Sequence, residues 1–82
     1  MNYEVEFKPR AVKDLESIPR DDRRRVVERI EMLSNALQGD VKKLTNFSPE
    51  YRLRVGNYRI LFEVKNDKVV IYRVLPRKDA YR

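Results

Sequence analysis

Residues 50–64 alternate apolar and charged side chains on either side of a Gly56-Asn57 dipeptide, and this pattern leaves little besides a β-hairpin open to the chain. Period-two alternation sends successive side chains to opposite faces of a strand. A Gly-Asn pair between two such runs is typical of a two-residue hairpin turn. We therefore expect strands over about 50–55 and 58–64, with one face in the core and the other exposed.

The alternation assigns the side chains of this hairpin to two faces. The expected core face consists of Tyr51, Leu53, Val55, Tyr58, Ile60 and Phe62. The other face carries Arg52, Arg54 and Arg59, and a two-residue turn pairs Arg54 directly with Arg59. Like charges placed opposite each other usually destabilise a sheet by about 1 kcal/mol or less. Such a feature often marks a functional site, and guanidinium groups suit phosphate oxygens. Simple solubilisation of an exposed face is the alternative.

Helical and strand periodicity place the remaining elements. The expected elements are a strand at 2–7, a helix that Pro9 begins and Pro19 ends, a second helix that Asp21 or Asp22 caps and that ends near Gln38 before Gly39, a basic connector from Asp40 to Ser48, and a last strand at about 68–75. The order β-α-α-β-β-β predicts an α+β fold, in which a helical hairpin packs on one face of a mainly antiparallel four-stranded sheet. We expect residues 1–82 to form a single domain.

The register of the last strand has two solutions. A turn at Asn66-Asp67 alone would place Arg73 opposite Ile60 on the core face, which is unfavourable for a charge. A three-residue turn or a bulge would place Arg73 beside Arg59. It would also bury three other side chains of the strand, Val70, Tyr72 and Val74. We favour the second solution.

Composition narrows the chemistry. The 82 residues include no cysteine and no histidine, which excludes disulfides, thiolate catalysis, ordinary zinc sites and a histidine acid–base pair. We expect no metal and no other cofactor. A net charge of +6, from 19 Lys and Arg against 13 acids, suits nucleic acid or an acidic protein partner. No apolar run approaches membrane-spanning length, so we expect no membrane contact and a cytoplasmic location.

Further basic residues stand where they can converge on the exposed face of the hairpin. Pro76 ends the last strand and directs the tail back toward the sheet, so that Arg77 and Tyr81 can join the three arginines. The candidate RNA-binding residues around this set are Lys42, Lys43, Arg73, Lys78 and Arg82. Tyr81 lies outside any expected strand, next to cations, and packing on the domain edge is its alternative role.

Three segments, 51–64, 67–74 and 77–82, together resemble the RelE branch of the RelE/ParE toxin superfamily. The resemblance covers essentially the whole chain, and it depends on an R-x-R-x-G-x-Y-R hairpin followed by an R-K-x-x-Y tail. It implies the toxin of a type II toxin–antitoxin system, which an acidic RelB-like antitoxin holds inactive. Such toxins enter the ribosomal A site and cut mRNA by attack of a ribose 2′-hydroxyl on the adjacent phosphate, which inhibits translation. They contact DNA only through the antitoxin complex.

The resemblance also implies roles for individual residues. The family's catalytic set maps onto Arg52, Arg54, Arg59, Arg77 and Tyr81. Relatives in this branch carry lysine where this chain has Arg52 and Arg54, and many carry histidine where it has Pro76. Because arginine is a poor general base, with a pKa above about 12, Tyr81 becomes the candidate for the base or for stacking the scissile nucleotide. The arginines would stabilise the charge of the phosphorane, and Arg77 would assist the leaving oxygen.

Two other functions fit the same sequence. A ParE-like inhibitor of DNA gyrase would bind protein without catalysis, but it has no need of phosphate-binding groups beside an aromatic ring. A non-catalytic RNA-binding module predicts salt-sensitive binding without cleavage. The exposed parts of the helical hairpin and the sheet edge are candidates for the antitoxin groove, with dimerisation of the chain as the alternative.

Overall fold

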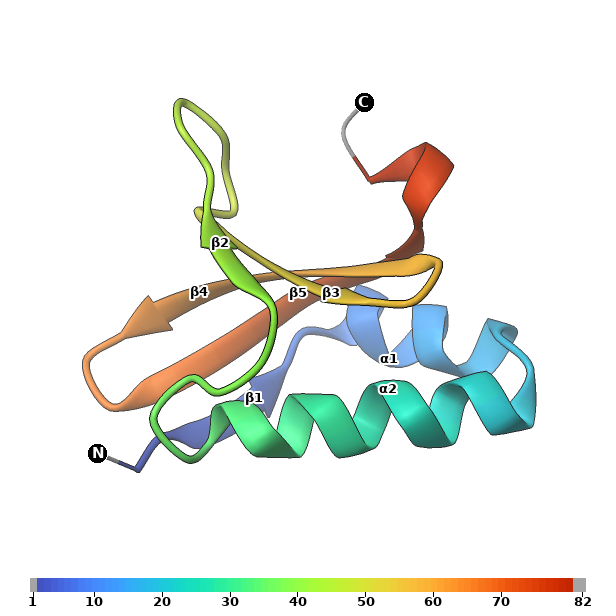
Figure 1. The fold of residues 1–82 in the computed structure, drawn as a ribbon, viewed down its shortest axis with the longest axis horizontal. Helices are drawn as coiled ribbons and strands as arrows, with labels where there is room; N and C mark the ends of the chain where they lie inside the picture. Colours follow the sequence, from blue (N-terminus) through green and yellow to red (C-terminus); the bar gives the residue numbers. More distant parts are fainter. Residues whose placement is uncertain (1, 81–82) are drawn as a thin grey trace.

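The computed structural model describes residues 2–80, with two helices covering one face of a five-stranded sheet (Figure 1). Along the chain the elements are β1 (Glu4–Phe7), α1 (Pro9–Ser17), α2 (Arg20–Leu33), β2 (Val41–Lys43), β3 (Tyr51–Val55), β4 (Tyr58–Lys65), β5 (Lys68–Pro76) and the short 3-10 turn η1 (Arg77–Asp79). The predicted α+β class, with a helical hairpin on one face of a mainly antiparallel sheet, is confirmed. Among residues 2–80, no helix has the length and hydrophobicity needed to cross a membrane.

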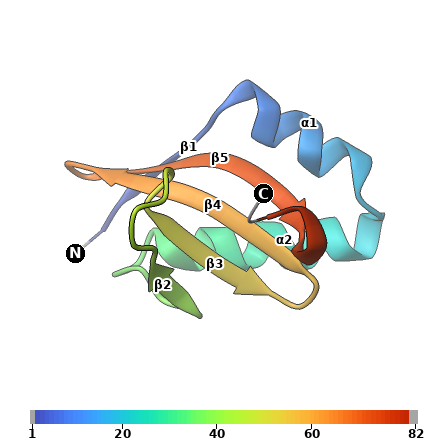
Figure 2. The ribbon, with the colours of Figure 1, turned by 90° about the horizontal axis from the view of Figure 1, so that it is seen from above.

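The strand order in the sheet is β1-β5-β4-β3-β2. β1 pairs with β5 in parallel, and the other neighbours are antiparallel. Figure 2, seen from above the face opposite the helices, shows the strands side by side, with α1 toward β5 and α2 beneath the sheet. The expected four strands become five because part of the basic connector forms β2. A strand of three residues is too short for an alternating pattern to reveal it.

The β3–β4 hairpin has the predicted register. Val55 pairs with Tyr58 across a turn in which Gly56 has φ 56°, and Arg54 pairs with Arg59. Glycine adopts this left-handed conformation without the cost that a Cβ atom brings. The expected core face of the hairpin points at the helices, and Leu53 is fully buried there.

Of the two alternatives for the last strand, a three-residue turn or a bulge, the structure has a bulge. The turn has two residues, since Lys65 pairs with Lys68, and the register shifts between Leu61 and Phe62 of β4. Tyr72 of β5 is the extra residue at this shift. Bulges of this kind bend a strand and change which side chains face the core.

The position of the bulge decides which residues of β5 are buried against the helices. Before it, Val69 and Ile71 face the core, and after it Val74 does. The prediction that Val70 and Tyr72 accompany Val74 in the core is therefore wrong. Val70 is buried on the opposite face of the sheet, and Tyr72 is only half-buried.

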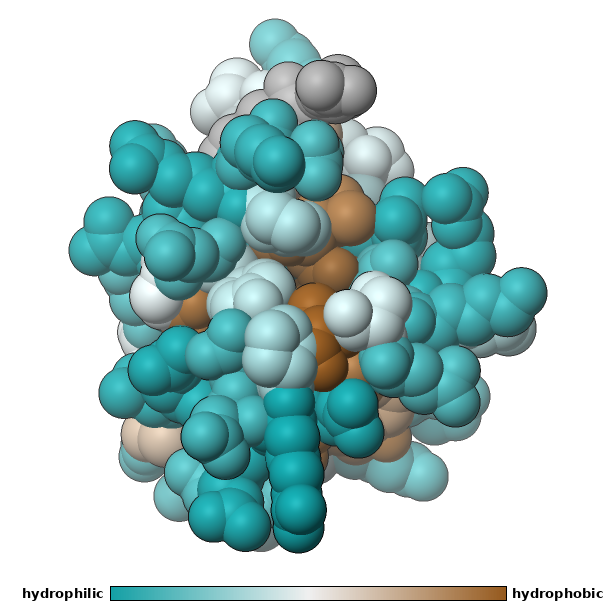
Figure 3. Space-filling model, turned by 90° about the vertical axis from the view of Figure 1, so that its right-hand side faces the viewer, coloured by the Kyte–Doolittle hydropathy of each residue, from teal (hydrophilic) through white to brown (hydrophobic). Residues whose placement is uncertain are grey.

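The core lies between the helices and the sheet, and all of its members are apolar. They are Ala11, Ile18, Val26, Ile30, Leu33, Leu53, Val55, Ile60, Phe62, Val69, Ile71 and Val74. Figure 3 views the molecule from its right-hand side in Figure 1, where hydrophilic residues cover most of the surface around a band of hydrophobic ones. A chain with 39% charged residues thus keeps its charges outside a small apolar core.

The ends of α2 differ from the prediction. Pro19 occupies the N-cap position and no side chain caps the helix, so neither aspartate has the expected role. The helix ends at Leu33, well before Gln38, at the point where the residues that precede β1 contact the chain. The N–H of Tyr3 donates to the carbonyl of Ser34 at 2.7 Å. After this contact the chain turns away instead of continuing the helix.

Gly39 has φ +123° and precedes β2. A Cβ atom at this position would lie 2.9 Å from Cδ1 of Leu53, so the glycine lets the backbone approach the core closely. Its expected role as the stop of the second helix is wrong.

Candidate nucleic-acid interface

The face of the sheet opposite the helices carries four basic side chains at facing positions of three strands. Lys42 of β2 pairs with Arg52 of β3, and Arg54 pairs with Arg59 of β4. Directly paired residues project to the same side of a sheet. We call this surface, with Lys42, Arg52, Arg54 and Arg59, the arginine face. Figure 1 shows the loop after β2 and the η1 turn rising above it on either side.

A single carboxylate holds the two arginines of β3. Asp40 Oδ2 lies 2.7 Å from Nε of Arg54, and its Oδ1 lies 3.9 Å from Nη1 of Arg52. The N–H of Arg54 also donates to the backbone carbonyl of Asp40 at 3.0 Å. This acid reduces the repulsion that three neighbouring arginines would otherwise create. Nothing in the sequence pattern singled out Asp40, because its role depends on the β2–β3 pairing.

Arg52 is more enclosed than an exposed strand residue would be. Its side chain is 12% exposed, and its Nε is a buried donor without a hydrogen-bond partner within residues 2–80. A buried donor left unpaired costs about 1–3 kcal/mol.

Arg59 is the most buried of the four basic residues, at 7% exposed. Its Nη1 donates to the carbonyls of Gly56 and Tyr58, each at 2.9 Å. The guanidinium therefore closes the hairpin turn from which it comes, and its position is fixed by two backbone acceptors. A charge held in this way is oriented before any ligand arrives.

The tail approaches the same end of the sheet. The N–H of Arg77 donates to the carbonyl of Asn57 at 2.7 Å, which fixes η1 beside the β3–β4 turn. The side chains of Arg77 and Lys78 are exposed. Tyr81 and Arg82, expected to complete this cluster, lie outside the described residues.

Arg73 does not join the arginine face in the way expected. It pairs with Leu61, two residues along β4 from Arg59 and on the same side of the sheet. Its guanidinium, however, binds the Asp14 carboxylate of α1 through Nε at 2.8 Å and Nη2 at 3.1 Å. The hydrogen bond that Arg73 donates to Asp14 raises the pKa of Arg73 above its usual value. Asp14 also accepts the N–H of Val74 at 2.9 Å. This ion pair binds α1 to β5.

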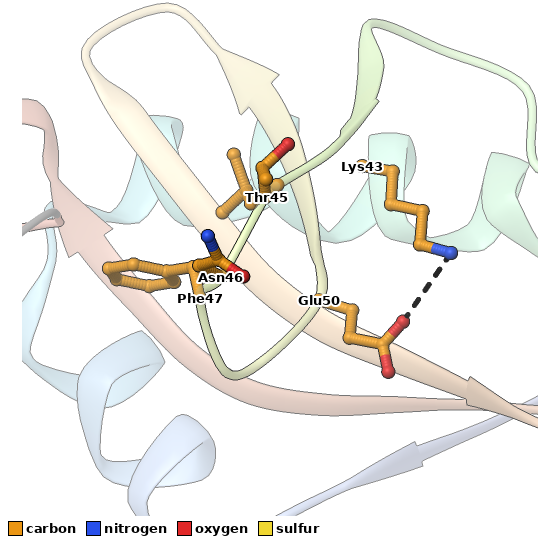
Figure 4. A pocket seen from close by; sticks show the side chains of 6 residues that line it. Lys43, Thr45, Asn46, Phe47 and Glu50 are labelled. Atoms are coloured by element: carbon orange, nitrogen blue, oxygen red, sulfur yellow. Dashed lines mark ion pairs between the residues drawn. The ribbon is translucent and has the colours of Figure 1, made fainter.

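The two connector lysines also separate. Lys42 lies on the arginine face, whereas Lys43 pairs with Tyr51 and its Nζ is 3.8 Å from a carboxylate oxygen of Glu50. Lys43 borders a hollow of about 440 Å³ in the loop between β2 and β3 (Figure 4). The residues lining the hollow are Lys43, Leu44, Thr45, Asn46, Phe47 and Glu50.

Phe47, which lines this hollow, was not among the candidate residues of the sequence analysis. An aromatic residue in a basic connector was the available signal. Among residues 2–80, no group of three or more acidic side chains lies close enough to hold a metal ion.

The sequence and the fold resemble those of known proteins. The sequence profile described as ParE toxin of type II toxin–antitoxin system matches residues 5–81. Toxin RelE3 of Methanocaldococcus jannaschii is 42% identical, over 94% of this chain and 93% of that protein.

Two solved structures share the fold over nearly all of their length. The RelB-RelE antitoxin–toxin complex from Methanococcus jannaschii matches with a TM-score of 0.78 and 41% identity, over 94% of this chain and 95% of that one. The toxin–antitoxin complex RelBE2 from Mycobacterium tuberculosis matches with a TM-score of 0.81 and 30% identity, over 94% and 100%.

A helical pair covering one face of a mainly antiparallel sheet is thus the architecture of a class of small toxin proteins. The chain belongs to the ParE toxin family of type II toxin–antitoxin systems and, by its relatives, to the RelE branch of that superfamily.

Proposed function

We propose that the protein is the toxin of a RelBE-type pair and that it is a metal-independent endoribonuclease that cleaves mRNA in the ribosomal A site. The observation that carries this proposal is the arginine face, where Arg52, Arg54 and Arg59 stand on adjacent strands and Arg59 is fixed by backbone carbonyls. Three preoriented guanidinium groups suit the phosphate at which negative charge develops.

In the proposed reaction, the 2′-hydroxyl oxygen of a ribose attacks the adjacent phosphorus atom and the bond from phosphorus to the 5′-oxygen breaks. The products are a 2′,3′-cyclic phosphate and a 5′-oxygen that becomes a free hydroxyl by taking a proton from water, while the proton of the 2′-hydroxyl passes to the general base. Arg54 and Arg59 stabilise the phosphorane, and Arg77 donates a hydrogen bond to the leaving oxygen. Tyr81 is the candidate for accepting the proton of the 2′-hydroxyl or for stacking the nucleotide. Lys42, Lys43 and Lys78 contact the RNA backbone.

We propose a RelB-like acidic antitoxin as the partner. The structures of related toxins are complexes with RelB, and a net charge of +6 suits an acidic partner. A partner that binds only the folded toxin also stabilises a small domain by mass action. Ribosome binding places the activity in the cytoplasm, and contact with DNA would be indirect, through the antitoxin.

The test is cleavage of mRNA on programmed ribosomes. The wild-type protein should cut in the A site without added metal, and Arg54→Ala should lower the rate by about 100-fold or more, the loss typical of one charge-stabilising donor. Arg24→Ala removes an exposed arginine from α2, on the far side of the sheet, and is the matched control. Equal cleavage by Arg54→Ala and the control would contradict the proposal.

Because the matched family profile is that of ParE, inhibition of DNA gyrase is the second candidate. A gyrase inhibitor would block supercoiling at toxin concentrations that leave mRNA on the ribosome intact. Running both assays on one preparation separates the two functions.

A further inference from the structure

The loop between β2 and β3 is held over the arginine face at both of its ends. The N–H of Leu44 donates to the carbonyl of Glu50 at 2.6 Å, which closes its base. Ser48 Oγ lies 3.4 Å from a carboxylate oxygen of Glu63 on β4. These contacts extend from an edge strand to the middle of the sheet, so the loop stands across this face instead of outside it (Figure 1).

The hollow in this loop combines chemical groups of several kinds. Figure 4 looks at the sheet with the helices behind it, and the Phe47 ring points across the strands, with Asn46 and Thr45 beside it. Lys43 and Glu50 lie on the other side of the loop and form an ion pair. An aromatic ring, an amide and a hydroxyl, which lie together on one side of the loop, are groups that proteins use to bind unpaired bases.

The hollow also lies next to cations suited to a phosphate backbone. Lys42 adjoins it in sequence and pairs with Arg52, so the arginine face begins one residue from the hollow. A single strand bound along the arginine face would therefore pass beside the hollow. Alternation of stacking surfaces with cations is the general design of single-strand binding sites.

We propose that this hollow is a base-binding subsite for single-stranded RNA, in which Phe47 stacks a nucleobase next to the phosphate on the arginine face. Asn46 contacts the edge of that base, and this contact contributes to sequence preference. The inference deepens the proposed function and depends on RNA being the ligand. It does not depend on cleavage.

A purely structural role for Phe47 is the competing explanation. Leu61 projects to the arginine face and is only 4% exposed, so side chains on this face cover it. Shielding Leu61 from water requires only apolar volume, whereas stacking on a base requires an aromatic ring. Phe47→Leu keeps most of the apolar volume and removes the ring, so it separates the two roles.

The absence of tryptophan from the chain provides a direct probe. Phe47→Trp introduces a single indole in the hollow, and base stacking should quench its fluorescence. The ligand is a short single-stranded oligonucleotide with 2′-O-methyl riboses, which cannot be cleaved by 2′-hydroxyl attack. Phe7→Trp is the control, because Phe7 is 36% exposed on β1, at the opposite edge of the sheet.

We expect the oligonucleotide to quench Phe47→Trp and to leave Phe7→Trp unchanged. An abasic phosphodiester of the same length should bind more weakly and cause no quenching. Phe47→Leu should weaken binding of the base-containing strand by about 5- to 150-fold, the loss of one stacked base, and Phe47→Tyr should restore it.

Two outcomes would overturn the inference. One is equal quenching by the abasic strand, and the other is the absence of any quenching of Phe47→Trp under conditions in which the wild-type protein binds the oligonucleotide. If Phe47→Leu does not fold, the fluorescence of Phe47→Trp still shows whether a base stacks in the hollow. Quenching without ribosomal cleavage would support the subsite and contradict the proposed reaction. Cleavage without quenching would support the reaction and contradict the subsite.

Discussion

The carboxylate of Asp40 lies 2.7 Å from Nε of Arg54, on the face where we propose that phosphate binds. The same carboxylate is 3.9 Å from Arg52. An acid in this position neutralises charge that a phosphate would otherwise meet. Under the proposed function, RNA and Asp40 therefore compete for Arg54.

Asp40→Asn should therefore strengthen the binding of single-stranded RNA. Because Arg54 and Asp40 are both about half exposed, water screens their attraction, and we expect a gain of about two- to fivefold in affinity. In a plot of the logarithm of the affinity against the logarithm of the salt concentration, the slope should also become more negative, by up to about 0.7. Binding titrations at several salt concentrations measure both quantities.

Glu28→Gln is the control for this prediction, since it makes the same change in net charge on the exposed surface of α2. A gain in affinity equal to that of Asp40→Asn would assign the effect to net charge alone. Weaker binding by Asp40→Asn would mean that the carboxylate orients the arginines and does not compete with RNA.

The Asp14–Arg73 ion pair yields a prediction about stability. Asp14 accepts hydrogen bonds from both Arg73 and the N–H of Val74. Asp14→Ala leaves both donors without this partner, and we expect a loss of about 2–3 kcal/mol in the free energy of unfolding. Arg73→Gln should cost less, because the Val74 contact survives. Urea denaturation provides both values.

The same variants test whether Arg73 belongs to the RNA-binding set. Since Asp14 holds its guanidinium, Arg73→Gln should leave the affinity for the 2′-O-methyl oligonucleotide within about twofold of the wild type. A loss of affinity as large as that caused by Arg54→Ala would show that Arg73 contacts the RNA.

The hairpin could be predicted from the sequence because its signals are local. The alternation around Gly56 fixes which side chains face the core and places Arg54 opposite Arg59. The position of Arg73 could not be predicted in this way, since a bulge at Tyr72 shifts the alternation and only the pairing with β4 reveals where the bulge lies.

The same distinction applies to the candidate site. The arginines of β3 and β4 were found from strand period alone. Asp40 and Phe47 lie in a connector without a regular pattern, and they reach the site only because β2 pairs with β3. Helix ends behave similarly, since α2 ends early, at the point where Tyr3 contacts the chain. Tertiary contacts override local signals at these positions.

Tyr58 yields a prediction about pH. Its hydroxyl donates to Asp22 of α2 at 2.9 Å, and burial, this hydrogen bond and the charge of Asp22 raise its pKa above 10.0. A pKa raised on folding means that the stabilisation is complete below about pH 10 and is lost as pH rises through the higher, folded value.

Tyr58→Phe should therefore lower the free energy of unfolding by about 0.5–1.5 kcal/mol at neutral pH. The difference between wild type and variant should shrink as pH rises above 10. Asp22→Asn removes the charge and keeps an acceptor, so it should reduce this pH dependence. Chemical denaturation at pH 7 and in steps above pH 10 measures it, and a constant difference would contradict the assignment.

Arg54 and Arg59 face each other across β3 and β4, yet their surroundings differ, and this difference predicts different consequences of substitution. Arg59 is 7% exposed and donates to the carbonyls of Gly56 and Tyr58. Arg59→Met leaves both acceptors without this donor, so we expect a loss of about 1–3 kcal/mol in stability together with a loss of cleavage. Arg54→Met, at a side chain that is 57% exposed, should lower cleavage and change stability by about 0.5 kcal/mol or less. Thermal melting curves of both variants measure the change in stability, and ribosomal cleavage assays measure the change in activity. Full cleavage by Arg59→Met would limit this arginine to closing the hairpin turn.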